Sequence, residues 1–236
     1  MCARNRIALY GGTFDPVHLG HLAIARKVCE LFEIDQVLFV PAQVAPHKVG
    51  HDVTPAIHRY AMLSLATQHD ERLLVSTFEL DSPKSAYTVD TLDHFKKALP
   101  DNDLFFIMGA DSWTEISTWR DWRRLLTTAN HIVVTRPGYN ISAPHEELRD
   151  RLIDLRSSGK EQEQQAGTGR NEQLEGGSGK IFLTDAVMKD ISATEVRRVA
   201  GEGRYEELAK LVPEPVAEYI AKYGIYRKSN EAKLNS

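Results

Sequence analysis

Short apolar runs alternate with helical patterns along this chain, and that order constrains the fold more than any other feature. Apolar runs typical of buried strands lie at 7–10, 36–40, 73–76, 104–108 and 131–135. Helical spacing of apolar residues predicts helices at 19–32, 54–68, 88–99, 119–126, 144–156, 192–200, 205–211 and 215–223. Parallel strands need a crossover between them, usually a helix, so this alternation favours a parallel sheet.

The expected fold is therefore α/β, a doubly wound Rossmann-like parallel sheet with helices on both faces. We expect residues 1–236 to form a single domain. Segment 157–180 is apolar only at Ala166 and Leu174, so it cannot bury enough surface to order itself, and it predicts a disordered insert loop. The last ten residues, 227–236, predict a flexible tail.

Composition excludes several classes of protein. The formal net charge is −4, whereas nucleic-acid modules usually carry a basic excess, so we expect no nucleic-acid partner. We expect no membrane association, because no apolar run approaches the ~20 residues of a membrane span. Cys2 and Cys29 form no disulfide or zinc framework, and the first residues carry no secretory signal, which together favour a cytoplasmic location.

The stretch "GGTFDPVHLGHLAIARK", directly after the first strand, carries more chemistry than a turn requires. Gly11 and Gly12 let backbone approach a ligand closely. His18 and His21 are three residues apart at the start of a helix, so their rings share one face. A lone pair of this kind is usually a surface feature of a glycine-rich turn. The whole combination is far more restrictive, and the free N–H groups of a helix start suit phosphate, so we expect a phosphate site here.

A second motif, "DISATEVRR", follows a late strand. Ser192 and Glu195 form a capping box, with Thr194 and Arg197 on the same opening turn. Capping boxes are common and alone indicate only a helix start. Hydroxyls, N–H groups and an arginine on one turn after a strand nevertheless predict a cradle for anions.

Two shorter motifs lie between these. "APHK" follows the second strand, where His47 and Lys48 either hold a phosphate or belong to an exposed loop. "SAYTVDTL" begins a helix, with Thr88 as its expected cap.

A third middle motif, "FIMGADSWTEISTWRDW", follows the fourth strand. Its Gly109 and Asp111 lie at the carboxyl end of the strand, where open parallel sheets bind ligands. Trp119 is near the same rim, although a tryptophan at helical spacing is more often part of a core.

"GGTFDPVHLGH" together with "DISATEVRR" resembles the signature of the nucleotidyltransferase superfamily related to class I aminoacyl-tRNA synthetases. With the middle motifs, residues 7–137 and 181–226 resemble the bacterial nicotinate-nucleotide adenylyltransferases. The resemblance implies transfer of AMP from ATP to nicotinate mononucleotide, giving deamido-NAD and pyrophosphate in NAD biosynthesis. The chain departs from the family in having one proline before His47 and in its polar insert.

The resemblance also implies roles for individual residues. The implied catalytic residues are His18, His21 and Arg197. Implied ATP-binding residues are Gly11, Gly12, Thr13, Phe14, His18, His21, Gly109, Asp111, Ile191, Ser192, Thr194 and Arg197. Implied residues for the second substrate are His47, Lys48, Tyr87, Thr88, Trp119 and Arg136. Trp119 would stack on the pyridine ring and Thr88 would meet its carboxylate.

Mg²⁺ is the expected cofactor, held mainly by ATP and water and not by a protein metal site. Asp111 would contact either a ribose or the shell of the metal. Alternatives that the sequence leaves open are the same transfer to nicotinamide mononucleotide or phosphopantetheine, and a regulator that binds nucleotide without catalysis. It also leaves the oligomeric state open.

Overall fold

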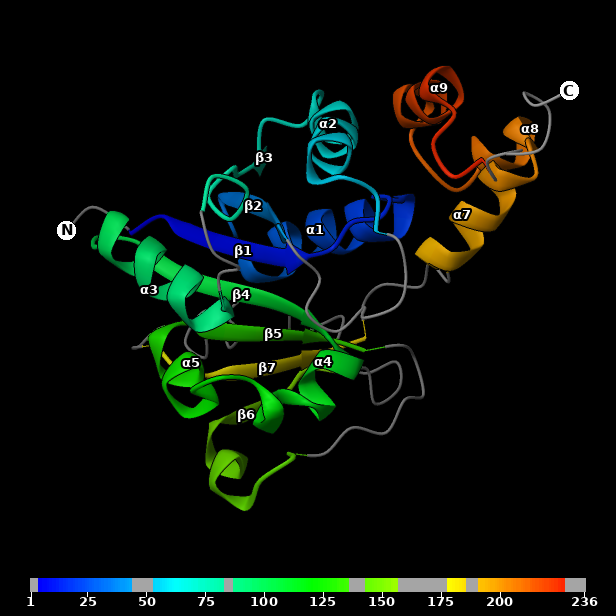
Figure 1. The fold of residues 1–236 in the computed structure, drawn as a ribbon. Coiled ribbons are helices and arrows are strands. Elements are labelled where there is room, and N and C mark those ends of the chain that lie inside the picture. Colours follow the sequence, from blue (N-terminus) through cyan, green and yellow to red (C-terminus); the bar gives the residue numbers. More distant parts are fainter. Residues whose placement is uncertain are drawn as a thin grey trace, which may run out of the picture.

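A computed structural model describes residues 4–43, 53–82, 87–135, 143–156, 178–185 and 191–227. Its centre is a seven-stranded sheet with the order β3-β2-β1-β4-β5-β7-β6, in which every paired neighbour is parallel (Figure 1). The strands are β1 (Arg6–Gly12), β2 (Gln36–Pro41), β3 (Leu73–Val75), β4 (Asp103–Gly109), β5 (Asn130–Val134), β6 (Leu152–Asp154) and β7 (Ile181–Thr184). The expectation of a parallel α/β sheet is confirmed.

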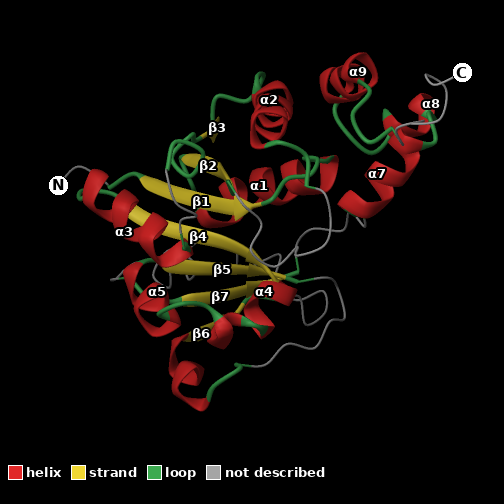
Figure 2. Ribbon diagram, viewed as in Figure 1, coloured by secondary structure: helices red, strands yellow, loops and turns green. Residues whose placement is uncertain are grey.

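Helices cover both faces of this sheet (Figure 2). They are α1 (Leu19–Phe32), α2 (Ala56–Thr67), α3 (Thr88–Ala98), α4 (Ala110–Thr114), α5 (Trp122–Thr128), α7 (Ala193–Gly201), α8 (Tyr205–Leu208) and α9 (Glu214–Tyr223), with the 3₁₀ turns η1 (Ile116–Thr118) and η2 (Glu146–Arg151). Alternate residues of β4 explain the two layers, because side chains of a strand point to opposite faces. Phe105 and Ile107 pack in a core with α1, α2 and α7–α9, whereas Phe106 and Met108 pack in a second core with α3, α4 and α5.

The order of the strands fixes where a ligand can bind. From β1 the chain proceeds outward through β2 to β3, and from β4 it proceeds the other way to β5. The switch point therefore lies between β1 and β4, and in open α/β sheets ligands bind beyond the carboxyl ends at such a point. The glycines that end β1, Gly11 and Gly12, and Gly109, which ends β4, lie at this edge.

One predicted helix was wrong, and another begins later than predicted. Segment 144–156 forms η2 followed by β6, because Leu152 and Ile153 pair with β7 and this tertiary pairing outweighs the local pattern. Segment 119–126 is helical only from Trp122, since Asp121 has a left-handed backbone (φ 51°) that interrupts the helix. The helices α4 and η1 precede it in the chain.

Smaller differences concern helix ends. Thr88 is the first residue of α3 and Tyr87 is its cap, so the capping role predicted for Thr88 was wrong. The helix predicted at 54–68 begins at Ala56, with Pro55 as its cap. The helix predicted at 205–211 is α8, which ends earlier, at Leu208.

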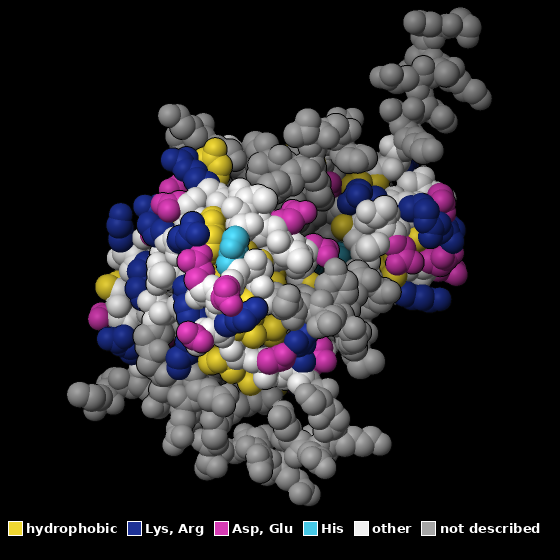
Figure 3. Space-filling view, turned by 90° about the horizontal axis from the view of Figure 1, so that it is seen from below, with side chains coloured by type: hydrophobic (Ala, Val, Ile, Leu, Met, Phe, Trp, Pro, Cys, Tyr) yellow, Lys and Arg dark blue, Asp and Glu magenta, His cyan; other side chains and the backbone are white. Residues whose placement is uncertain are grey.

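Among the described residues, no helix is long and apolar enough to cross a bilayer. On the face seen from below in Figure 3, basic and acidic side chains are interspersed. Most of the predicted insert and tail, at 157–177 and 228–236, lies outside the described residues.

Candidate active site

The turn after β1 is shaped by aromatic packing. Phe14 has a left-handed backbone (φ 49°), and its buried ring packs against Tyr10 and Phe39. A Cβ on Gly12 would lie 2.9 Å from that ring, so this position requires glycine. Because the Phe14 side chain is part of the core, only its backbone could take part in the ATP binding predicted for it.

The two histidines of the motif lie together at the start of α1, as their spacing predicted. Their rings stack with centroids 3.7 Å apart and an interplanar angle of 28°. His18 is the cap of the helix, and its backbone N–H donates to Nδ1 of His21 over 3.2 Å. In the neutral ring of His21 this bond leaves the proton on Nε2.

Burial sets the charge of His18. Its side chain is 7% exposed, and burial lowers its pKa to about 4. Its Nδ1 is buried and has no hydrogen-bond partner within the described part of the chain. At neutral pH this ring is therefore an uncharged group with one N–H to donate, and an anion beside it would favour its protonated form.

Arg197 brings the late motif to the early one. Its Nη1 donates to the carbonyl oxygen of Asp15 over 2.7 Å, although the two residues are 182 positions apart. Its Nη2 donates to Oγ1 of Thr194 over 3.2 Å. Ser192 caps α7 by accepting the backbone N–H of Glu195, which confirms the predicted cap. The guanidinium is thus anchored on the turn that leads into the two histidines.

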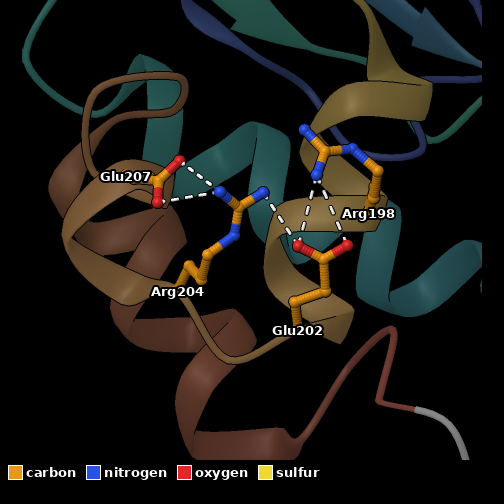
Figure 4. A network of polar contacts seen from close by, with 4 residues as sticks. All are labelled: Arg198, Glu202, Arg204 and Glu207. Carbon is orange, nitrogen blue, oxygen red and sulfur yellow. Dashed lines mark hydrogen bonds and ion pairs between the residues drawn. The ribbon is translucent and has the colours of Figure 1, made fainter.

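Ion pairs hold the far end of the helix that carries Arg197. Glu202 pairs with Arg198 at 3.2 Å and with Arg204 at 2.8 Å, and Arg204 also pairs with Glu207 at 2.7 Å (Figure 4). The network joins α7 to α8 across a short turn. These groups are partly exposed, so each pair contributes about 1 kcal/mol or less to stability.

Asp15 is a buried centre of this site that the sequence reasoning left without a role. Its side chain is 4% exposed. Oδ1 accepts the hydroxyl of Tyr226 over 2.7 Å, and Oδ2 accepts the backbone N–H of Thr54 over 3.3 Å. With the bond from Arg197 to its carbonyl, Asp15 joins three distant segments of the chain.

Arg59 was also missed, although the sequence contained a signal. It lies on the apolar stripe of α2 with Met62, Leu63 and Ala66, where a charge is unexpected, and it is 1% exposed. Its guanidinium donates to the carbonyl oxygens of four residues: Thr13 (2.7 Å), Ala42 (2.6 Å), Gln43 (3.2 Å) and Thr54 (2.8 Å). Arg59 therefore holds the turn after β1 against the segments that follow β2.

The rim beyond β4 holds Gly109 and Asp111, which were predicted to bind ATP, and it lies near Tyr87 and Trp119, which were predicted to bind the second substrate. Gly109 caps α4, and a Cβ there would meet nothing within 4 Å, so this edge is open. Asp111 is exposed in the first turn of α4. Tyr87, half exposed, lies under the guanidinium of Arg120 at 4.5 Å, and the neighbouring Trp119 is half-buried against the core.

The remaining predicted residues are dispersed over the fold or lie outside the described part of the chain. Ile191 packs against the core beside α7, and Thr88 is at the start of α3. His47, Lys48 and Arg136 lie outside the described residues. Across the residues that are described, no group of three or more His, Cys, Asp or Glu side chains could hold a metal ion.

The chain is similar to known proteins in sequence and in fold. The family described as Cytidylyltransferase-like matches residues 9–199. A protein of Thermus thermophilus named "Probable nicotinate-nucleotide adenylyltransferase" is 40% identical over 222 residues, which cover 94% of this chain and 100% of that protein. One of the same name from Symbiobacterium thermophilum is 37% identical over 224 residues, covering 94% of this chain and 95% of that protein.

A solved structure shares the fold. Plasmodium falciparum nicotinic acid mononucleotide adenylyltransferase complexed with NaAD has a TM-score of 0.69 and 20% identity, covering 94% of this chain and 98% of that one. At this identity the likeness concerns the fold alone.

Proposed function

The chain belongs to the cytidylyltransferase-like family, and from that premise we propose that its two motifs act on one ATP molecule. It is a nucleotidyltransferase of NAD biosynthesis that moves AMP from ATP to nicotinate mononucleotide. An oxygen of the 5′-phosphate of nicotinate mononucleotide forms a bond to the α-phosphorus. The bond from that phosphorus to the oxygen that bridges it to the β-phosphate breaks, which yields deamido-NAD and pyrophosphate.

A phosphate is an adequate nucleophile, so catalysis here is positioning and stabilisation of charge. His18 and His21 donate to the α-phosphate as its charge develops. The stacked rings favour this role, because they direct two imidazoles to one place at the start of α1. Arg197 holds the leaving pyrophosphate together with the hydroxyls of Ser192 and Thr194.

The observation that carries the proposal is the hydrogen bond from Arg197 to the carbonyl of Asp15. A triphosphate reaches both motifs only if they face one space. This contact fixes the guanidinium on the turn that precedes His18, which brings the two motifs together and supports their acting on one triphosphate.

Nucleotidyltransferases of this kind use a divalent cation, and we assign Mg²⁺ to that role. The exposed carboxylate of Asp111 at the rim would contact either a ribose or the shell of a cation that arrives with ATP, and Mg²⁺ binds readily through phosphates and water. When bound, the ion neutralises charge on the phosphates.

The acceptor is assigned to the rim beyond β4. Trp119 offers an aromatic face there, and Tyr87 is linked to the same segment through Arg120. The N–H groups at the start of α3, beside Thr88, suit a carboxylate. This favours nicotinate over its amide. His47, Lys48 and Arg136 are proposed to bind the phosphate end of the acceptor.

One experiment tests the reaction and the acceptor together. The purified protein is mixed with ATP and Mg²⁺ and with nicotinate mononucleotide, nicotinamide mononucleotide or phosphopantetheine, and the products are weighed by mass spectrometry. We expect deamido-NAD as the main product. A dominant product from another acceptor would change the assigned substrate, and binding of ATP without any product would favour the regulator.

A further inference from the structure

Tyr226 connects the C-terminal segment to the turn before the histidines. Its hydroxyl donates to Oδ1 of Asp15 over 2.7 Å, across 211 positions of sequence. Asp15 in turn accepts Arg197 through its carbonyl oxygen. Asp15 therefore links the phenol of Tyr226 to the guanidinium of Arg197, which the proposed function assigns to pyrophosphate.

Two features indicate that Tyr226 is held in place for this contact. Its backbone is left-handed (φ 69°), which non-glycine residues adopt rarely and at a cost in free energy. Burial and the nearby carboxylate of Asp15 raise the pKa of its phenol, so the hydroxyl keeps its proton and remains a donor well above neutral pH.

We propose that Tyr226 is a positioning residue, which fixes Arg197 for the leaving pyrophosphate by holding Asp15. The inference rests on the proposed function, because it acts through the role assigned to Arg197. Without the phenol hydroxyl, the buried Oδ1 loses its donor and the Asp15 carbonyl is no longer held in one place. The guanidinium then samples several positions, and the stabilisation of the transition state weakens.

A purely structural Tyr226 would behave differently, since it would lower stability and affect activity whether or not Arg197 is present. A matched control exists in the same C-terminal region. The hydroxyl of Tyr219 on α9 lies 2.9 Å from Nδ1 of His58 on α2, so Tyr219→Phe also removes a phenol contact between elements but none to Asp15.

The test is a double-mutant cycle on Tyr226→Phe and Arg197→Ala with Tyr219→Phe alongside. Steady-state kinetics are measured with ATP and nicotinate mononucleotide, and the affinity for a non-hydrolysable ATP analogue is measured by calorimetry. Urea unfolding of each variant sets conditions under which it is folded. If Tyr226→Phe does not fold, Asp15→Asn is the second variant. It weakens the hydrogen bond between Tyr226 and Asp15 by changing the acceptor instead of the donor.

We expect Tyr226→Phe to lower kcat/KM for ATP about tenfold, with KM for nicotinate mononucleotide changed less than about twofold. Adding it to Arg197→Ala should cause less than about a twofold further loss, and Tyr219→Phe should stay near wild type. Asp15→Asn should repeat this dependence on Arg197. An equal loss from Tyr226→Phe in both backgrounds, or no loss, would overturn the inference.

The proposed function is judged separately in the same samples. A wild type that binds the analogue but forms no product contradicts the proposed transfer, and the calorimetric cycle then decides the coupling between Tyr226 and Arg197. If Arg197→Ala matches wild type in turnover and affinity, the role of Arg197 and the inference both fail while the reaction stands. A wild type that neither reacts nor binds overturns both proposals.

Discussion

Replacing Arg59 by methionine is expected to destabilise the chain more than any exposed arginine could. The guanidinium is buried and donates to four carbonyl oxygens at 2.6–3.2 Å. Methionine fills much of the same space but donates nothing, so those carbonyls lose a charged donor. Asp15, which interacts favourably with the charge of Arg59, is left buried without it.

The magnitude follows from these contacts. Removing one partner from a buried charged network destabilises a protein by about 3–5 kcal/mol. A chain of this size loses roughly 2–4 °C of Tm per kcal/mol, so Arg59→Met should melt about 6–20 °C below wild type. Arg59→Lys keeps the charge, but the lysine cannot reach all four carbonyls. Its Tm should therefore lie between those of wild type and Arg59→Met.

Thermal and urea unfolding, followed by circular dichroism, measure the change. Arg26→Met is the matched control, because Arg26 is an exposed arginine whose Nε donates to Asp70 at 3.1 Å. Arg26→Met should lose less than about 1 kcal/mol of unfolding free energy. If Arg59→Met lost no more free energy of unfolding than Arg26→Met, the claim that Arg59 holds together the segments after β1 and β2 would be refuted.

Three further changes test the site and its surroundings. His18→Ala should lower kcat about 10²–10³-fold in steady-state assays, the usual effect of losing one such donor; normal turnover would remove His18 from the mechanism. The urea midpoint should change little, because the lost packing of the buried ring is offset by removal of its unpartnered Nδ1. Burial first, and then the charge of Arg151, lowers the pKa of His131 to about 3. Its unfolded pKa is about 6.5, so the stability from its neutral form is present above pH 6.5 and is lost as pH falls toward 3. Between pH 7 and pH 5, the free energy of unfolding of wild type should therefore fall by about 2 kcal/mol more than that of His131→Leu, as measured by urea titrations. Equal decreases in the two proteins would contradict this. Ser192→Ala should cost about 1 kcal/mol of stability through the lost cap of α7, and a change below about 0.3 kcal/mol would show that the cap is not needed.

The sequence was sufficient where local chemistry decides the structure. The predicted helix 19–32 coincides with α1, because its apolar residues recur at helical spacing and Gly12 and Pro16 separate it from the strand before it. The contact between His18 and His21 followed in the same way, since residues three apart at the start of a helix lie on one face.

The sequence was insufficient where distant segments decide the structure. Residues 152–154 become a strand only because β7 offers an edge to pair with, and nothing local indicates this. The buried Arg59 was visible as a charge on an apolar stripe, but its partners are carbonyls of segments that meet only in the folded chain. The same holds for Tyr226, whose partner is 211 positions away.

The burial of His18 itself argues for function over structure. A buried polar atom without a partner costs about 1–3 kcal/mol, and Nδ1 of His18 is such an atom within the described residues. An apolar side chain at the same place would avoid that cost. Local rules of this kind are broken mainly at functional or strained sites, and His18 lies in the candidate active site. A phosphate oxygen beside the ring, as the proposed function places it, would supply both an acceptor for its N–H and the negative charge that favours a second proton, and it would then offset that cost.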